Sequence, residues 1–309
     1  MKIEILYPEM SNIYGDYGNI MFLKKCLPDA EFVETELHSE PAFVKQDINL
    51  VYLGSMTEKA QEIIIRSLKP YKDKLNEYIQ TGKAILFTGN SLEILGKYIE
   101  NDDETKIEGL GILDIYSKRE MFNRYNSLFL GEFKNIKIVG FKDQFAHSYG
   151  NNETTYFAKV IRGAGLNRES KLEGIRINNF IGTSILGPIL VLNPEFAKFF
   201  VHNILGQTKA KIPFEKAAYE SYEARLKEYE DINLKIMGNI KYILSRLSKM
   251  DYKAMLNKVN EVHKKTGKSR LSIFLDMSEC AKKYGAGYMD YDLFEMYNLT
   301  DEQRDTYIT

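Results

Sequence analysis

The chain has 309 residues, of which 44% are hydrophobic and 12% aromatic, so it is long enough for one large domain or two ordinary ones with packed cores. Its 42 basic and 43 acidic residues leave a formal charge of −1, which gives no electrostatic reason to expect nucleic acid or an anionic membrane as the main partner. No apolar run approaches the roughly 20 residues of a membrane span, and the first residues do not form a signal peptide. We therefore expect a cytoplasmic protein with no transmembrane segment.

Strand-like runs recur through the first two hundred residues, with helical patterns between several of them. We expect strands at residues 2–7, 50–53, 84–87, 136–141, 157–161 and 189–192, and helices at 20–25, 57–80 and 91–99. The long helical pattern begins at Thr57 as a cap and is kinked or split by Pro70. This alternation predicts a mostly parallel α/β sheet flanked by helices, with ligands at the carboxyl ends of its strands, where Gly54 and Gly89 fall.

The pattern changes after Gly206, because the residues from 213 to about 250 and from 252 to 265 lack strand alternation and carry helical patterns. We place one domain at residues 1–207 and a mostly helical extension at 208–309. Within that extension, residues 285–297 have aromatic side chains at spacings near three, which favours packing on another domain over a role in docking.

Several short motifs have a structural explanation that is simpler than a functional one. SNIYGDYGNI, residues 11–20, places two glycines before a helix; this suits a tight turn, and the alternative is an anion held by backbone amides. TGKS, residues 266–269, lacks the earlier glycine of a phosphate loop, because position 262 is valine. The four histidines show no metal-ligand spacing, and the two cysteines, Cys26 and Cys280, form no metal or disulfide pattern. We expect no metal and no cofactor.

LFTGNSLEILG, residues 86–96, describes a strand that turns sharply into a helix through Thr88, Gly89, Asn90 and Ser91. A strand–turn–helix passage of this kind is typical of a nucleophile elbow, in which one side chain is exposed at the tip of the turn. No cysteine or histidine stands at this tip.

Several stretches occur together in the order and approximate spacing of one family. They are YPEMSNIYGDYGN (7–19), LVYLGSMTEKAQ (50–61), GKAILFTGNSLEILGKY (82–98), EGLGILDIYS (108–117), RGAGLN (162–167) and EGIRINNFIGTSILGPILVLNPEFA (173–197). Residues 1–206 thereby resemble the class I glutamine amidotransferase domains of the cobyric acid synthase type, in particular the glutaminase subunit of lipid II isoglutaminyl synthase. The resemblance implies a flavodoxin-like α/β fold with a helical C-terminal extension.

In that family an elbow cysteine attacks the side-chain amide of glutamine and a histidine activates it. The alignment of the elbow places the cysteine at Gly89, or at Thr88 after a slip of one residue. The family pattern T-Y-L-H-G-P is similar to TSILGP, residues 183–188, and places the histidine at Leu186. The resemblance therefore implies that nucleophile and base are both replaced, so that no catalytic residue is intact.

Other positions of the family pattern remain. Gly54 matches the oxyanion-loop glycine, and Arg124 matches an arginine near the glutamine. We expect a small, glutamine-like ligand at Gly54, Ser55, Thr88, Asn90, Ser91 and Arg124, bound but not cleaved.

Three functions are weighed on these grounds. The first is a degenerate, glutaminase-inactive module that supports a ligase in the modification of a peptidoglycan or polysaccharide precursor. The second is an active subunit that hydrolyses glutamine and delivers ammonia to a Mur-ligase-like or other ligase, with a base such as His147 near Thr88 or Ser91. The third is a structural partner whose aromatic tail docks an assembly. Residues 258–309 also resemble the lead of ATP-grasp proteins associated with sugar transfer, which suggests a ligase in the same chain or a separate one.

Overall fold

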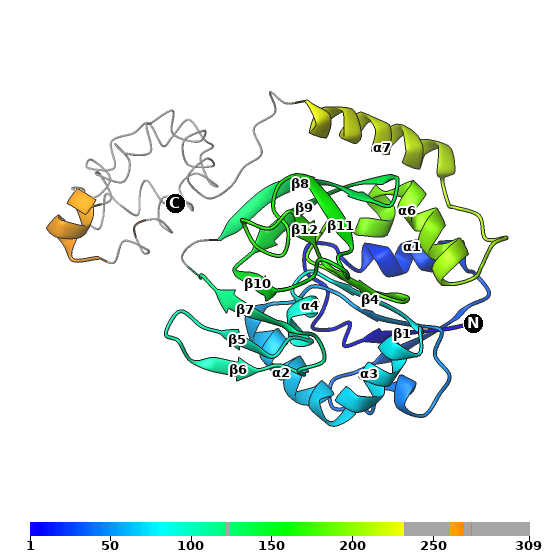
Figure 1. Cartoon of the computed structure of the whole chain (residues 1–309), viewed down its shortest axis with the longest axis horizontal. Helices are drawn as coiled ribbons and strands as arrows, with labels where there is room; N and C mark the ends of the chain where they lie inside the picture. Colours follow the sequence, from blue (N-terminus) through cyan, green and yellow to red (C-terminus); the bar gives the residue numbers. More distant parts are fainter. Residues whose placement is uncertain (122–123, 232–259, 269–272, 274–309) are drawn as a thin grey trace, which may run out of the picture. The chain divides into compact units, whose positions relative to one another are not determined.

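The computed structural model describes residues 1–121, 124–231, 260–268 and 273 (Figure 1). The chain divides into two units, of which the first spans residues 1–236 and holds the sheets described below. The described residues of the second unit include a short helix at 260–266, which is followed by a turn at Gly267 with φ +69°.

A central sheet of six strands has the order β13-β14-β4-β3-β1-β2. Its strands are β1 (Lys2–Leu6), β2 (Glu31–Thr35), β3 (Leu50–Leu53), β4 (Ala84–Thr88), β13 (Ile175–Ile177) and β14 (Phe180–Thr183). All neighbours pair in parallel except β13 and β14, which are antiparallel. The predicted parallel, helix-flanked sheet is confirmed, and with it the flavodoxin-like class of fold.

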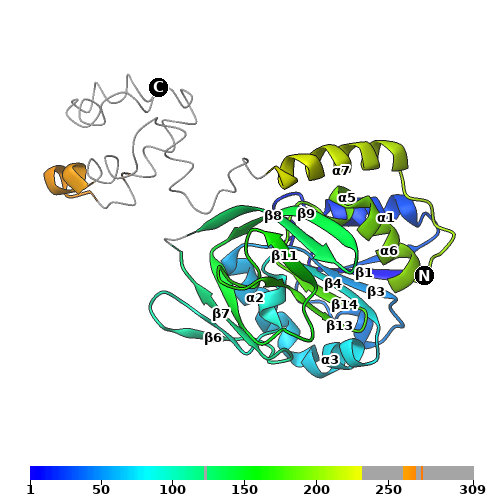
Figure 2. The ribbon, with the colours of Figure 1, turned by 45° about the horizontal axis from the view of Figure 1, so that its top comes forward.

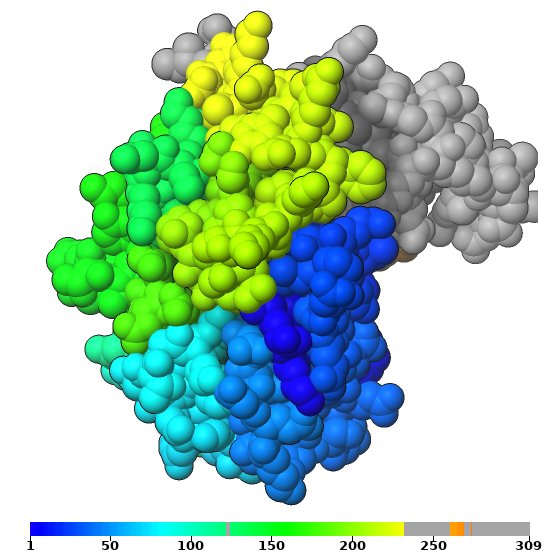
Figure 3. Space-filling model, turned by 90° about the vertical axis from the view of Figure 1, so that its right-hand side faces the viewer, coloured from blue at the N-terminus to red at the C-terminus, as the bar shows by residue number. Residues whose placement is uncertain are grey.

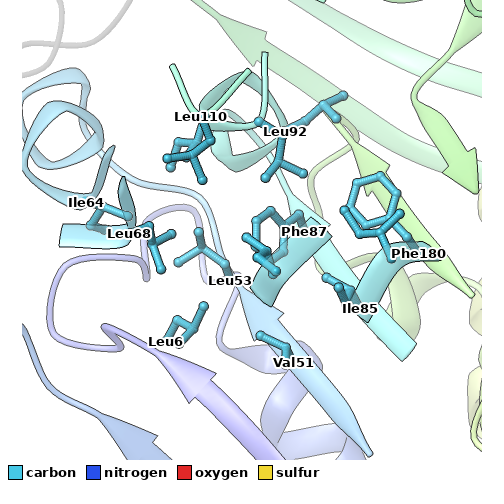
Figure 4. Close-up of a cluster of buried hydrophobic side chains, with 14 of the residues drawn as sticks. Leu6, Val51, Leu53, Ile64, Leu68, Ile85, Phe87, Leu92, Leu110 and Phe180 are labelled. Atoms are coloured by element: carbon cyan, nitrogen blue, oxygen red, sulfur yellow. The ribbon is translucent and has the colours of Figure 1, made fainter. Parts of the chain in front are cut away.

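Helices cover both faces of this sheet (Figure 2). On one face lie α2 (Glu58–Leu68) and α3 (Lys72–Gln80), and Ile64 and Leu68 of α2 join a core with alternate residues of the strands (Figure 4). On the other face lie α1 (Gly18–Cys26), α5 (Ile189–Leu192) and α6 (Pro194–Phe199). In Figure 3 the blue N-terminal segment adjoins the yellow-green segment that contains α6. Burial on both faces explains why β3 and residues 84–87 of β4 are apolar.

Two further sheets of four strands each, which the sequence analysis did not predict, follow the elbow in the chain. One has the order β10-β7-β5-β6 and the other β12-β11-β8-β9. Their strands are β5 (Tyr98–Glu100), β6 (Lys106–Glu108), β7 (Ile115–Arg119), β8 (Tyr125–Phe133), β9 (Ile136–Gln144), β10 (Ala146–Gly150), β11 (Ala158–Arg162) and β12 (Leu172–Glu173). Strands expected at 136–141 and 157–161 correspond to β9 and β11.

Two of the predicted elements are wrong. Residues 189–192 form helix α5 and not a strand, because Val191 and Leu192 both donate backbone hydrogen bonds to the carbonyl of Pro188, at 3.1 Å each. A short apolar run that is buried has no periodicity to separate the two. The helix expected at 91–99 is the single turn α4 (Ser91–Ile94), because the backbone after Gly96 enters β5.

The helical pattern at 57–80 is split as expected. Thr57 caps α2 by accepting a hydrogen bond from the amide of Ala60 at 3.2 Å, and Pro70 lies in a 3₁₀ turn, η2 (Lys69–Tyr71), between α2 and α3. Two other short elements are η1 (Ala42–Val44) and η3 (Phe200–Ile204).

Helix α7 (Glu215–Glu230) packs on the sheet of β8 and β9 within the first unit. Its buried Tyr222 contacts Leu130 and Val139, and the Tyr222 hydroxyl donates to the carbonyl of Lys137 at 2.8 Å. The domain boundary at 207/208 stays a prediction. The aromatic run at 285–297 and most of the ATP-grasp-like tail lie outside the described residues. No helix in the described part of the chain is long and apolar enough to cross a membrane.

Candidate functional site

The predicted elbow lies at the carboxyl end of β4. Gly89 has φ +64°, a left-handed conformation that glycine adopts without strain, and it reverses the chain between Thr88 and the start of α4. The Ser91 hydroxyl donates to the carbonyls of Leu53 at 3.2 Å and Thr88 at 2.7 Å. Ser91 therefore stabilises the turn, and its hydroxyl proton is not directed to a ligand.

The space at the tip of the elbow is filled from two sides. A Cβ atom at position 89 would lie 2.5 Å from the Cβ of Ser55 and 3.1 Å from Cδ2 of Leu186. The first distance is far below van der Waals contact, and it involves an atom fixed to the backbone. No side chain fits at position 89 unless its neighbours move, and Leu186 lies where the resemblance places a histidine.

Asp16, which the sequence analysis did not single out, lies beneath the elbow. Its carboxylate accepts hydrogen bonds from the Thr88 hydroxyl, from the Ser55 amide at 2.9 Å and from Nδ2 of Asn19 at 2.9 Å. Burial raises the pKa of Asp16, and these hydrogen bonds oppose the shift. The turn at residues 11–20 thus presents Asp16 to the elbow. The signal in the sequence was an Asp–Asn pair at spacing three in a glycine-rich turn.

The loop after β3 is locked to the elbow. A Cβ on Gly54 would lie 2.3 Å from the carbonyl oxygen of Ser11, so only glycine fits there. Asn90 uses both ends of its amide on Met56: Oδ1 accepts from its backbone N–H at 3.0 Å, and Nδ2 donates to its carbonyl at 2.8 Å. The Ser55 N–H donates to Asp16 and the Met56 N–H donates to Asn90, so both backbone groups have protein partners.

Arg124 lies at the rim of the site. Its guanidinium donates to both oxygens of Asp143 and, at 2.8 Å, to the Tyr14 hydroxyl. The Asp143 side chain is 6% exposed and that of Arg124 is 33% exposed, so the carboxylate is buried while the guanidinium stays partly in contact with solvent. Arg124 is therefore neutralised by Asp143.

These elements enclose a cavity of about 170 Å³. Its lining residues are Ile13, Tyr14, Ser55, Met56, Thr57, Glu58, Gly89, Asn90, Glu93, Asp143, Gln144, Phe145, Ala146, Ser184 and Leu186. Of the predicted ligand-binding residues, Ser55 and Asn90 line it, as do the two family catalytic positions. Gly54, Thr88, Ser91 and Arg124 support the walls without lining the cavity.

Glu93 lines the cavity and is, after Asp16, a second residue that the sequence analysis did not single out. It is 5% exposed, and its Oε2 accepts a hydrogen bond from Nε2 of Gln61 at 2.9 Å. Burial raises the pKa of Glu93 to about 7, which the bond from Gln61 and the charge of Arg119 partly oppose. Arg119 in turn donates to Oε1 of Gln61 at 2.9 Å. The available signal was a carboxylate within the apolar run LEIL.

His147 is not placed as a base for the elbow. Its Nε2 accepts a hydrogen bond from Nε of Arg168 at 3.0 Å, and its ring packs edge-on against Tyr125. Burial lowers the pKa of His147 to about 4, and the charges of Arg168 and Lys142 add to the effect. The structure shows no hydrogen bond between His147 and Thr88 or Ser91. Among the described residues, no three or more histidines, cysteines and carboxylates are grouped so that they could hold a metal ion.

In this mostly parallel sheet, strand β4 turns through a left-handed glycine into a short helix, and a cavity lies at that turn. These features define an amidotransferase-like α/β domain. Residues 2–193 match the family model of the CobB/CobQ-like glutamine amidotransferase domain. The chain belongs to this family.

Two curated relatives are both described as the GatD subunit of a lipid II isoglutaminyl synthase. The chain is 27% identical over 247 residues to the GatD subunit of the glutamine-hydrolysing lipid II isoglutaminyl synthase of Streptococcus pneumoniae, an alignment that covers 76% of this chain and 92% of the relative. It is 28% identical over 206 residues to the GatD subunit from Staphylococcus aureus, covering 66% and 83%.

Among solved structures, a glutamine amidotransferase aligns with a TM-score of 0.43 at 14% identity, over 66% of this chain and 98% of that one. A glutamine amidotransferase from Thermotoga maritima aligns with a TM-score of 0.43 at 10% identity, over 72% and 92%.

Proposed function

We propose that this chain is a glutamine amidotransferase-like subunit that has kept the family pocket, has lost glutamine hydrolysis, and supports a ligase that modifies a cell-envelope precursor. The observation that carries the loss is the packing at position 89, where Ser55 and Leu186 occupy the space that a nucleophile would need. A hydrolytic site of this family requires a thiolate and a base. Gly89 and Leu186 supply neither.

The surroundings of the elbow support the same proposal. Thr88 and Ser91, the two hydroxyl residues of the elbow itself, donate to Asp16 and to backbone carbonyls, so each hydroxyl has a structural role. A serine or threonine nucleophile needs an adjacent base more than a cysteine does, and His147 pairs with Arg168 instead. The amides of Ser55 and Met56, which face the elbow, already donate to side chains.

The partner is proposed from the relatives, which are named as subunits of lipid II isoglutaminyl synthases. A ligase on a separate chain is the arrangement that these names favour, with a peptidoglycan precursor as its substrate. A fused ATP-grasp domain is the alternative that the resemblance of residues 258–309 suggests. Deleting residues 250–309 tests whether that segment carries the association, since the α/β domain has its own core.

The test of the function is release of glutamate from glutamine by the purified chain, with and without its ligase, beside the S. aureus relative as positive control. We expect no release above the uncatalysed rate. Steady release that disappears in Thr88→Val or Ser91→Ala would overturn the proposal and favour an active glutaminase with relocated groups.

A further inference from the structure

The cavity at the elbow has an unequal supply of hydrogen-bond donors and acceptors. Three side-chain donors that line it are engaged: Nδ2 of Asn90 donates to the Met56 carbonyl at 2.8 Å, the Ser55 hydroxyl to the carbonyl of Ile13 at 2.9 Å, and the Ser184 hydroxyl to Glu173 at 3.0 Å. A ligand group that must accept hydrogen bonds from side chains, such as a carboxylate or an oxyanion, finds these three donors already used.

Acceptors, by contrast, are left over. Oε1 of Gln144 is buried without a hydrogen-bond partner among the described residues, while its Nε2 donates to the Ala146 carbonyl at 3.2 Å, which fixes the orientation of the amide. Glu93 is 5% exposed, and only its Oε2 has a partner, Gln61. Both residues line the cavity, so two acceptors in its walls await a donor.

The charge at the site, like the surplus of acceptors, favours a cationic ligand. Three carboxyl groups line the cavity, on Glu58, Glu93 and Asp143, and the nearby guanidinium of Arg124 is already paired with Asp143. A ligand carboxylate would thus meet carboxylates and no unpaired cation, which in a largely enclosed space is unfavourable. The remaining walls include Ile13, Met56 and Leu186, which suit a short aliphatic stem.

We propose that this cavity binds a primary ammonium group on a short aliphatic stem, with Oε1 of Glu93 and Oε1 of Gln144 as its acceptors. An ammonium supplies three donors and one positive charge, which match the unused acceptors and the excess of carboxylates. The inference rests on the proposed function for the site, and it replaces an intact glutamine, with its α-carboxylate, by an amine as the preferred ligand.

The experiment is a titration of the full chain with n-propylamine hydrochloride, followed by NMR or calorimetry at constant ionic strength, beside n-propanol, butyrate and L-glutamine. We expect n-propylamine to bind with a millimolar dissociation constant, and the other three to bind more weakly. Glu93→Gln should weaken amine binding about tenfold, because a charge-assisted hydrogen bond is lost. Gln144→Met should weaken it several-fold, whereas Glu132→Gln, at an exposed position of β8 that does not line the cavity, should leave it unchanged.

The pH dependence provides an independent readout. The charges of Glu58 from α2 and Arg119 from β7 act on Glu93, and Asp143 from β9 lines the same cavity. As Glu93 ionises around its pKa of about 7, the amine should bind more tightly. Nα-acetyl-lysine methylamide identifies the source of the ammonium: tighter binding than that of n-propylamine supports the same chemistry supplied by a partner's lysine, and weaker binding supports a free amine.

Two results separate the hypotheses. Glutamine hydrolysis by the natural chain would overturn the proposed function, whatever the amine titration shows. Absence of hydrolysis, combined with tighter binding of butyrate or glutamine than of n-propylamine, or with amine binding unaffected by both Glu93→Gln and Gln144→Met, would overturn only the assignment of an ammonium ligand.

Discussion

Ser55 and Gly89 face each other so closely that a Cβ on residue 89 would lie 2.5 Å from the Cβ of Ser55. The two residues come from the loop after β3 and the turn after β4, which are neighbouring parallel strands. The glycine at the elbow is therefore fixed by its neighbour as well as by its own backbone conformation. A side chain at position 89, a thiol included, therefore requires a further change at Ser55 or Leu186.

Gly89→Ala tests this packing, with Gly111→Ala as a matched control. Both glycines have φ +64°, but a Cβ at Gly111 meets nothing within 4 Å. The control should lose about 1 kcal/mol of unfolding free energy from backbone strain. Gly89→Ala should lose a further 1–3 kcal/mol or so from overpacking, and Ser55→Gly should restore most of that excess. Urea denaturation measures all of these, and equal losses in the two alanine variants would contradict the packing argument.

Rebuilding the family residues gives a second prediction. Gly89→Cys combined with Leu186→His should yield a thiol that reacts slowly with iodoacetamide, because Ser55 still occupies its space. Adding Ser55→Gly should increase the alkylation rate at neutral pH by about tenfold or more, as the thiol reaches the new imidazole. The natural chain gives the background rate, to which buried Cys26 contributes little because burial raises its pKa to about 12. Identical rates in the two variants would show that Ser55 is not the obstacle.

The elbow and the central strands β1, β3 and β4 were predictable because their signals are local, whereas β2, β13 and β14 were not predicted. Apolar runs of four or five residues, broken by glycine and followed by a cap such as Thr57, indicate strands and helices without knowledge of the rest of the chain. The two four-stranded sheets were not predicted. In one of them, the turn between β8 and β9 has Lys134 at φ +55° in place of a glycine signal.

The chemistry of the cavity could not be predicted for a different reason. Glu93 acquires its raised pKa from burial among residues that are distant in sequence, and Asp16 reaches Thr88 across 72 positions of the chain. Ser55 was expected to bind a ligand, and nothing in its sequence context indicated that it fills the space of a nucleophile. Such relationships depend on which turns the sheet brings together.

The raised pKa of Glu93 has a consequence for stability. The carboxyl group titrates near its ordinary 4.5 in the unfolded chain and at about 7 in the folded one. Between these values the folded state binds more protons, so the unfolding free energy should decrease as pH rises from 4.5 to about 7. Glu93→Gln should remove up to about 3 kcal/mol of this decrease. Chemical denaturation of both proteins at pH 4.5 and pH 8 measures it, and parallel pH profiles would refute a buried, titrating Glu93.

His147 should act in the opposite direction. Its pKa is lowered from 6.5 to about 4 by burial, so the unfolded state binds more protons between these values. The stability that it contributes is complete above pH 6.5 and is lost as pH falls toward 4. In His147→Gln, which keeps an acceptor for Arg168, unfolding free energy should decline less steeply on acidification. An unchanged slope from pH 6.5 to pH 4 would mean that the imidazole is protonated in the folded protein.

The loop that carries Leu186 depends on a buried ion pair. Lys142 is 0% exposed and donates to Glu173, while Oε1 of Glu173 accepts from the Ser184 amide and the Thr183 hydroxyl, both at 2.9 Å. Glu173 therefore fixes the two residues from which the chain runs on to Leu186.

Lys142→Met should lower the unfolding free energy by about 3–5 kcal/mol, because Glu173 is left as an unpaired buried charge. Adding Glu173→Gln should recover more than half of that loss, since the amide oxygen still accepts from the loop and no charge remains. Lys137→Met on the same strand is the control: its pair with Glu230 is about 40% exposed on both sides and should contribute less than about 1 kcal/mol. Urea denaturation of the variants decides the matter, because a loss in Lys142→Met no larger than in Lys137→Met would mean that the buried pair does not hold this loop in place.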